Sequence, residues 1–152
     1  MGKSDRQLCV LTDARGRPIP QSADIVTFAH TAIRKLEPAC IILHGSMARG
    51  DYTQASDVDL LVIGGRLPER FLDRLGLLIE MNTTRARIET VAYSCEEFEK
   101  MLGECHLTAL EAMEFGIPLY GRRYFAQLRR LFNNMKTRGL RRGHTSWHIA
   151  LT

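Results

Sequence analysis

The segment HGSMARGDYTQASDVDLLVI, from His44 to Ile63, decides the expected fold of this chain. Residues 39–43 before it and residues 59–63 at its end are apolar and rich in Ile, Leu and Val, which is typical of buried β-strands. Between them, Gly45 permits a tight turn, and residues 50–56 have the composition of a loop. The segment therefore predicts a strand, a Gly-Ser turn, a loop and a second strand.

Asp57 and Asp59 lie one residue apart at the start of the second expected strand. Because successive side chains of a strand alternate, both carboxylates point to the same side. They repel each other unless a cation lies between them, and charges within an apolar strand are costly without a partner. Mg²⁺ suits such ligands, since it binds few carboxylates together with phosphate oxygens and water. Two such ions could activate an attacking hydroxyl and neutralise a leaving pyrophosphate.

The Gly45–Ser46 turn, separated from Asp57 by ten residues, is a candidate binding site for nucleotide phosphates. Ser46 adds a hydroxyl beside exposed backbone N–H groups, and a helical turn over residues 47–49 would direct these groups at a phosphate. The planar guanidinium of Arg49 could donate further hydrogen bonds to the same phosphate. A Gly-Ser turn alone is usually only a turn, and an Asp-x-Asp pair alone is usually a solvated strand end. The hypothesis therefore depends on the two motifs occurring together.

The strings GSMARG at residues 45–50 and SDVDL at residues 56–60 resemble the signature of the nucleotidyltransferase superfamily related to DNA polymerase β. Within it they are most similar to the minimal nucleotidyltransferase (MNT) branch. In organisation the resemblance covers residues 23–121, and the specific motif occupies residues 44–63. It implies a palm-like domain in which Ser46 contacts nucleotide phosphate and the two aspartates bind Mg²⁺, with two ions expected.

Superfamily members usually have a third carboxylate on a later strand, and Glu89 is the candidate here. It is the only acidic residue in the strand-like segment RIETVAY, residues 87–93. In the two-metal scheme Glu89 would bind metal and act as the general base for the incoming hydroxyl. The alternative is a surface glutamate paired with Arg85 or Arg87. The chain has Glu where the superfamily often has Asp.

The resemblance also implies a reaction and a partner. MNT proteins are often encoded beside a HEPN-domain protein, so the implied activity is an antitoxin that transfers AMP from ATP to a tyrosine of a HEPN toxin. Two other functions stay open. One is a small-molecule nucleotidyltransferase of the aminoglycoside-modifying kind, working as a homodimer. The other is a non-catalytic module that binds a toxin or RNA.

The order of the expected elements favours an α/β (α+β) fold, a small mixed sheet with helices packed on one face. Residues 1–121 are expected to form the nucleotidyltransferase domain, with a hairpin possible within residues 1–20. Pro68 is expected to open a helix, whose apolar residues at helical spacing are Phe71, Leu72, Leu75, Leu78 and Ile79. Residues 122–152 are expected to form a basic helix and tail on the same domain. Because they are too few for a second core, we expect a homo- or hetero-oligomer to complete the acceptor side.

Charge is unevenly distributed along the 152 residues, which carry a net charge of +4. Residues 115–152 contain eight Lys or Arg and no Asp or Glu. A segregated positive segment indicates an acidic partner, either nucleic acid or an acidic protein face. The alternative is an amphipathic terminal helix with a solvated arginine face.

Other features of the sequence indicate a cytoplasmic protein. There is no apolar run near 18 residues, so no membrane association is expected, and the N-terminus lacks the apolar segment of a secretion signal. The four cysteines are widely spaced and form no C-x-x-C pair, which is typical of reduced packing thiols.

Overall fold

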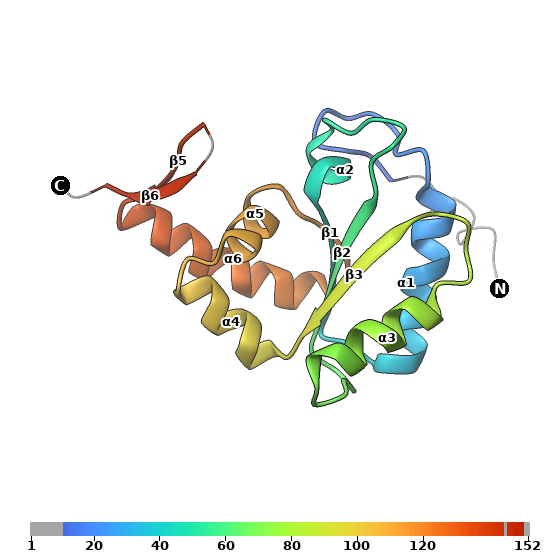
Figure 1. The fold of residues 1–152 in the computed structure, drawn as a ribbon. Coiled ribbons are helices and arrows are strands. Elements are labelled where there is room, and N and C mark those ends of the chain that lie inside the picture. The colour runs from blue at the N-terminus through green and yellow to red at the C-terminus, as the bar shows by residue number, and fades with distance from the viewer. Residues whose placement is uncertain (1–10, 145, 151–152) are drawn as a thin grey trace.

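The computed structural model describes residues 11–144 and 146–150 (Figure 1). Its elements in chain order are α1 (Ser22–Leu36), β1 (Cys40–His44), α2 (Gly45–Arg49), β2 (Val58–Ile63), α3 (Phe71–Met81), β3 (Ile88–Tyr93), α4 (Cys95–Gly103), α5 (Leu107–Phe115), β4 (Ile117–Tyr120), α6 (Arg122–Thr137), β5 (Leu140–Arg142) and β6 (Trp147–Ile149). None of the helices in this described part is long and apolar enough to cross a bilayer.

Four strands form one mixed sheet in the order β3-β2-β1-β4. β1 is antiparallel to both β2 and β4, whereas β2 and β3 are parallel. A parallel pair needs a crossover connection, and α3 supplies it. The predicted fold class, an α+β fold with a small mixed sheet, is confirmed.

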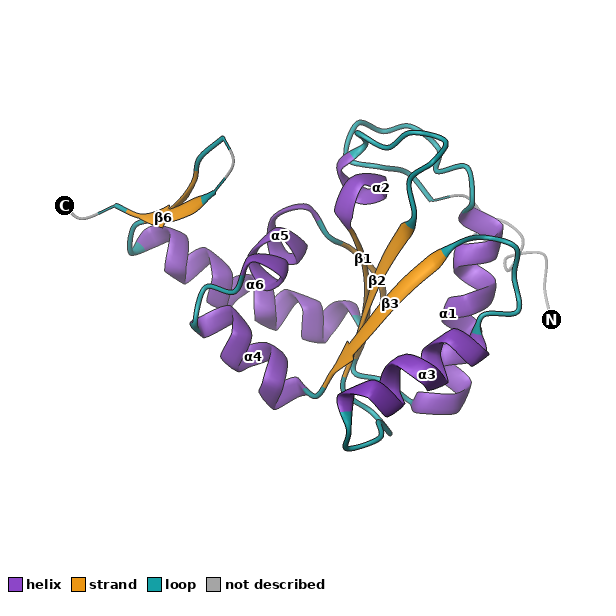
Figure 2. Cartoon of the chain, in the orientation of Figure 1, coloured by secondary structure: helices purple, strands orange, loops and turns teal. Residues whose placement is uncertain are grey.

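Helices cover both faces of this sheet, which corrects the expectation that they pack on one face (Figure 2). α1 and α3 form one layer, and α4, α5 and α6 form the other. The reason lies in the central strands, which are apolar on both sides. On β1, Ile41 and Leu43 enter the core with α1, whereas Ile42 enters the core with α5 and α6. A strand of this composition needs cover on both faces.

α3 buries only part of the apolar set that its spacing predicted, since Leu78 lies in the core and Leu75 is half-buried. The helix begins at Phe71, and the side chains of Leu72 and Ile79 are exposed. Arg74 is buried instead, with 7% of its surface exposed. Its guanidinium contacts Glu97 at the start of α4, so an ion pair accompanies Leu78 and Met81 on the inward side of α3.

The N-terminal hairpin is only partly within the described residues. Thr12 and Pro18 form an isolated antiparallel bridge around a turn in which the Asp13 carboxylate accepts the N–H groups of Arg15 and Arg17. The N–H of Ala14 donates to the carbonyl of Ala48, which ties this turn to α2. Residues 1–10 lie outside the described part of the chain.

α6 packs its apolar side on the core through Phe125, Leu128 and Phe132. The β5–β6 hairpin follows, and its Trp147 ring contacts Phe132 edge to face, with 5.6 Å between ring centroids. The C-terminal elements thus extend the layer that α4 and α5 form on the sheet.

Candidate active site

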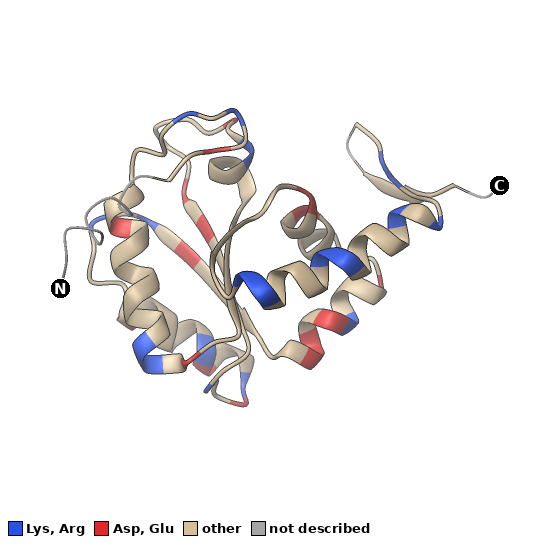
Figure 3. Ribbon diagram, turned by 180° about the vertical axis from the view of Figure 1, so that it is seen from behind, with Lys and Arg blue, Asp and Glu red and all other residues tan. Residues whose placement is uncertain are grey.

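The register of the central strands brings the predicted carboxylates together. Asp59 on β2 lies opposite His44 on β1 and beside Glu89 on β3. Side chains at paired positions of neighbouring strands point to the same face, and Asp57 lies two residues before Asp59. Acidic positions accordingly lie next to one another on adjacent strands (Figure 3). This face is the one covered further along by α4, α5 and α6.

Asp59 is the most perturbed of these carboxylates. Burial raises its pKa to about 6, and the negative charges of Glu89 and Asp57 contribute to the increase. The positive charge of Arg49 acts in the opposite direction. The three acidic groups and this arginine therefore interact electrostatically. The two neighbouring acids raise the pKa of Asp59 by more than Arg49 lowers it.

Gly45 adjoins Asp59 at the start of α2. Its φ is +71°, a left-handed conformation that glycine adopts without strain. A Cβ at this position would collide with Oδ2 of Asp59, so the absence of a side chain makes room for the carboxylate. Ser46 follows, half-buried, and its carbonyl accepts the N–H groups of Gly50 at 2.9 Å and Asp51 at 3.2 Å.

Arg49 supplies positive charge beside the carboxylates. Its Nε donates to Oδ2 of Asp51 at 3.1 Å. Burial and, to a smaller extent, the charge of Arg49 together lower the pKa of His44 to about 4, so His44 is neutral at pH 7. Arg49 is therefore the cation on α2 that is available to an anion at this site.

Asp57 pairs with Arg87, whose Nε lies 3.2 Å from Asp57 Oδ1. The contact lacks hydrogen-bond geometry, and this buried oxygen accepts no hydrogen bond from the described residues. Glu89 is exposed and forms no ion pair within the described part of the chain. Glu89 is thus a surface glutamate, as the alternative expected, but it pairs with neither Arg85 nor Arg87 in the described part of the chain, and Arg87 contacts Asp57 instead.

The donor set fits Mg²⁺ bound together with a nucleotide better than a bare metal ion. Within residues 11–144 and 146–150, no three Asp, Glu, His or Cys side chains are grouped closely enough to hold a metal ion. Asp57 Oδ1 nevertheless lacks a hydrogen bond, and Asp59 is crowded by like charges. Mg²⁺ requires only one or two carboxylates when phosphate and water complete its coordination.

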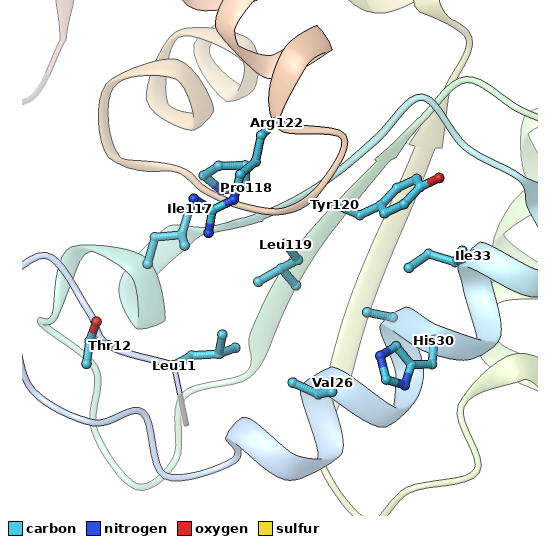
Figure 4. Close-up of a pocket in the computed structure, with 11 residues that line it drawn as sticks. Leu11, Thr12, Val26, His30, Ile33, Ile117, Pro118, Leu119, Tyr120 and Arg122 are labelled. Atoms are coloured by element: carbon cyan, nitrogen blue, oxygen red, sulfur yellow. The ribbon is translucent and has the colours of Figure 1, made fainter. Parts of the chain in front are cut away.

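A separate groove of about 440 Å³ lies between α1 and β4 (Figure 4). Leu11, Val26 and Leu119 form part of its apolar lining, with His30 and Arg122 at its sides. None of the candidate site residues lines it. The groove and the carboxylates are therefore distinct features of the surface.

Comparison with known families places this arrangement in a class. Residues 29–104, half of the 152-residue chain, match the family model of the nucleotidyltransferase domain. The chain belongs to this family and is a nucleotidyltransferase. The matched range contains all the candidate site residues, namely Gly45, Ser46, Arg49, Asp57, Asp59 and Glu89, and it ends before α5. No curated protein matches the chain.

Two relationships at the site were missed by reasoning from the sequence. Gly45 was expected to form a turn, but its contact with Asp59 depends on how α2 lies against β2. Arg87 was considered only as a partner for Glu89. A signal for its true position was present, because Arg87 precedes Glu89 by the same two residues by which Asp57 precedes Asp59. In a parallel pair, equal spacing aligns both pairs of residues.

Proposed function

We propose that this chain is a Mg²⁺-dependent nucleotidyltransferase that transfers a nucleoside monophosphate, AMP from ATP, to a hydroxyl group. The observation that carries the proposal is the position of Asp59. Its carboxylate lies against a glycine turn and is crowded by the charges of Asp57 and Glu89. Such crowding destabilises the site unless cations bind there, and a metal–triphosphate complex supplies them.

Each residue has a distinct role in this proposal. Asp57 and Asp59 would hold Mg²⁺, with Glu89 as a third carboxylate. When bound, the metal would neutralise phosphate charge and favour ionisation of the attacking hydroxyl. Gly45 and Ser46 would lie along the phosphates, and Arg49 would add a guanidinium to them.

The transfer itself is an in-line displacement. The hydroxyl oxygen forms a bond to the α-phosphorus, the bond from this phosphorus to the bridging oxygen breaks, and pyrophosphate leaves. The hydroxyl proton passes to Glu89, which acts as general base. Two features of Glu89 support this role: its side chain is exposed, and it lies beside Asp59 on the neighbouring strand.

The acceptor in this proposal is a tyrosine of a HEPN-type toxin, for which the chain acts as antitoxin. The resemblance of the motif to MNT proteins supports it, as does the exposed face of α6, which is basic (Figure 3). Within the described part of the chain, no ion pair involves the exposed arginines of this helix, Arg122, Arg123 and Arg130, or Arg138 directly after it. This surface would attract an acidic partner and assemble a hetero-oligomer, although nucleic acid is a second class of partner that it would attract.

The proposal places the protein in the cytoplasm. The cysteines within the described residues, Cys40, Cys95 and Cys105, are free thiols. Free thiols suit a reducing compartment.

Transfer from α-labelled nucleotides tests the proposal. The protein is incubated with ATP, GTP, CTP or UTP and Mg²⁺, with the product of the neighbouring gene or with aminoglycosides. We expect label from ATP on the partner protein and loss of transfer in the Asp57→Ala/Asp59→Ala variant. Asp73→Ala is the control, since Asp73 is exposed on α3 and should leave transfer unchanged.

The other outcomes distinguish the alternatives. Label on an aminoglycoside would instead support a small-molecule transferase. Absence of transfer from every nucleotide, with partner binding unchanged in the double aspartate variant, would contradict catalysis and favour a binding module.

A further inference from the structure

The register of β2 and β3 arranges four ionisable side chains in two rows on one face of the sheet. Asp59 and Glu89 form the first row. One pleat earlier, Asp57 and Arg87 form the second, where the N–H of Val58 donates to the Arg87 carbonyl at 2.9 Å. Arg87 is thus the one cationic member of this group of four, and its backbone is fixed beside the carboxylates.

The side chain of Arg87 is held only loosely. Besides the approach of Nε to Asp57, its Nη2 donates to the carbonyl of Ala55 at 3.3 Å. The side chain is 73% exposed, and Asp57 Oδ1 remains without a hydrogen bond. An ion pair with such exposure contributes little free energy, so the guanidinium can leave Asp57 readily.

A divalent cation on Asp57 would compete with Arg87 for the same carboxylate, and the two positive groups would repel each other. The backbone of Arg87 is fixed by the sheet, so a displaced guanidinium stays at the edge of the site. A guanidinium can bind phosphate oxygens through two parallel hydrogen bonds. In the proposed function, the triphosphate that accompanies the metal would be such an anion.

We propose that Arg87 neutralises Asp57 in the absence of metal and binds the nucleotide triphosphate once metal has taken this carboxylate. The inference rests on the proposed function and specifies how the same site takes up its substrates. Arg87 therefore weakens the binding of metal alone and strengthens the binding of metal with triphosphate. By thermodynamic linkage, each of the two ligands increases the affinity for the other.

Two binding measurements test this without catalysis. Electron paramagnetic resonance measures Mn²⁺ binding, and calorimetry measures binding of a non-hydrolysable ATP analogue in the presence of Mg²⁺. For Arg87→Gln we expect Mn²⁺ alone to bind about two- to fivefold more tightly, since a weak competing ion pair is removed. We expect the analogue with Mg²⁺ to bind roughly tenfold more weakly, since a charged hydrogen-bond donor is lost.

Arg85→Gln is the matched control, because it removes the same charge from an exposed side chain two residues away, which lies in no ion pair within the described residues. Arg87→Lys should retain part of the triphosphate affinity, as it keeps the charge without the planar fork. If Arg87→Gln binds both ligands as Arg85→Gln does, the inference is overturned and the proposed function stands. If the wild-type protein binds neither ligand, both are overturned.

Discussion

Gly45 and Asp59 occupy complementary space, since a Cβ on the glycine would collide with Oδ2 of the carboxylate. The Gly45→Ala variant would combine this collision with a left-handed backbone at φ +71°. We expect it to lose about 1–3 kcal/mol of unfolding free energy, which urea unfolding measures. We also expect displacement of Asp59 to weaken Mn²⁺ binding by about tenfold or more.

Gly76→Ala is the control for this substitution. Gly76 lies within α3, has ordinary helical φ, and has no atom within 4 Å of an added Cβ. Alanine there should raise the unfolding free energy by up to about 1 kcal/mol and leave Mn²⁺ binding unchanged. Wild-type Mn²⁺ affinity in Gly45→Ala would show that the glycine serves only the turn.

The raised pKa of Asp59 predicts that this residue destabilises the metal-free protein. Burial and the charges of Glu89 and Asp57 raise its pKa from 3.8 to about 6, so the folded state binds the proton more tightly than the unfolded state. The contribution of Asp59 to stability therefore falls as pH rises from 3.8 to about 6 and stays low above that range. Asp59→Asn should raise the unfolding free energy by about 1–2 kcal/mol at pH 7.5 in EDTA, while abolishing transfer.

Mg²⁺ with nucleotide should reverse the order of stability of the wild-type protein and Asp59→Asn. Mg²⁺ with nucleotide should raise the melting temperature of the wild-type protein and not that of Asp59→Asn, since ligands stabilise the state that binds them. Asp73→Asn, an exposed change on α3, should behave as wild type under both conditions. Equal responses of Asp59→Asn and wild type to Mg²⁺ would contradict the assignment of Asp59 as a ligand.

The sequence predicted the sheet more completely than the helical layers. Residues 40–43 and 60–63 are continuous apolar runs, and alternation within the second strand predicts that Asp57 and Asp59 share one face. Such patterns are local and are visible in a single strand. The same runs are apolar on both sides and therefore indicate helices on both faces, which the order of the elements alone does not show.

Tertiary relationships explain the remaining differences. The apolar spacing on α3 predicts that Leu72, Leu78 and Ile79 face the core, but only Leu78 does. Arg74 is buried beside it, and its guanidinium contacts Glu97, 23 residues later. The row formed by Asp57 and Arg87 likewise required the register between β2 and β3. Neither relationship is encoded in a local period of the sequence.

Glu97 links α3 to α4 and should make stability depend on acidic pH. Its carboxylate accepts hydrogen bonds from Nη1 of Arg74 at 2.9 Å and from the backbone N–H of Ser94 at 3.1 Å. Burial acts to raise the pKa of Glu97, but these contacts outweigh burial and lower it below 4.5. The contribution of ionised Glu97 to the free energy of unfolding is therefore present above pH 4.5. It is lost as the pH falls through the lower pKa of Glu97 in the folded state.

Glu97→Gln should lower the unfolding free energy at pH 7 by about 1–2 kcal/mol, since it weakens a charged hydrogen bond to a buried arginine. The difference from wild type should shrink as the pH of the urea unfolding experiment is lowered below 4.5. Glu96→Gln changes a neighbouring exposed residue and should show neither effect. A pH-independent difference between Glu97→Gln and wild type would contradict the ionic contribution.

Trp147 makes the docking of the β5–β6 hairpin measurable, because it is the single tryptophan of the chain. Its Nε1 donates to Oε1 of Glu111 on α5 at 3.3 Å, and Nε of Arg142 lies 3.3 Å from the same oxygen. Glu111→Ala removes both contacts, so we expect the half-buried indole to become hydrated and its fluorescence emission to shift to longer wavelength. Exposed pairs contribute little to global stability, and the unfolding free energy should fall by less than about 1 kcal/mol. Glu114 lies on α5 as Glu111 does, and Glu114→Ala removes its ion pair with Lys136 of α6, which should leave the emission unchanged. Unchanged emission in Glu111→Ala would show that Glu111 does not hold the hairpin, since contacts such as those of the indole with Phe132 and of Arg142 with Phe115 remain in that variant.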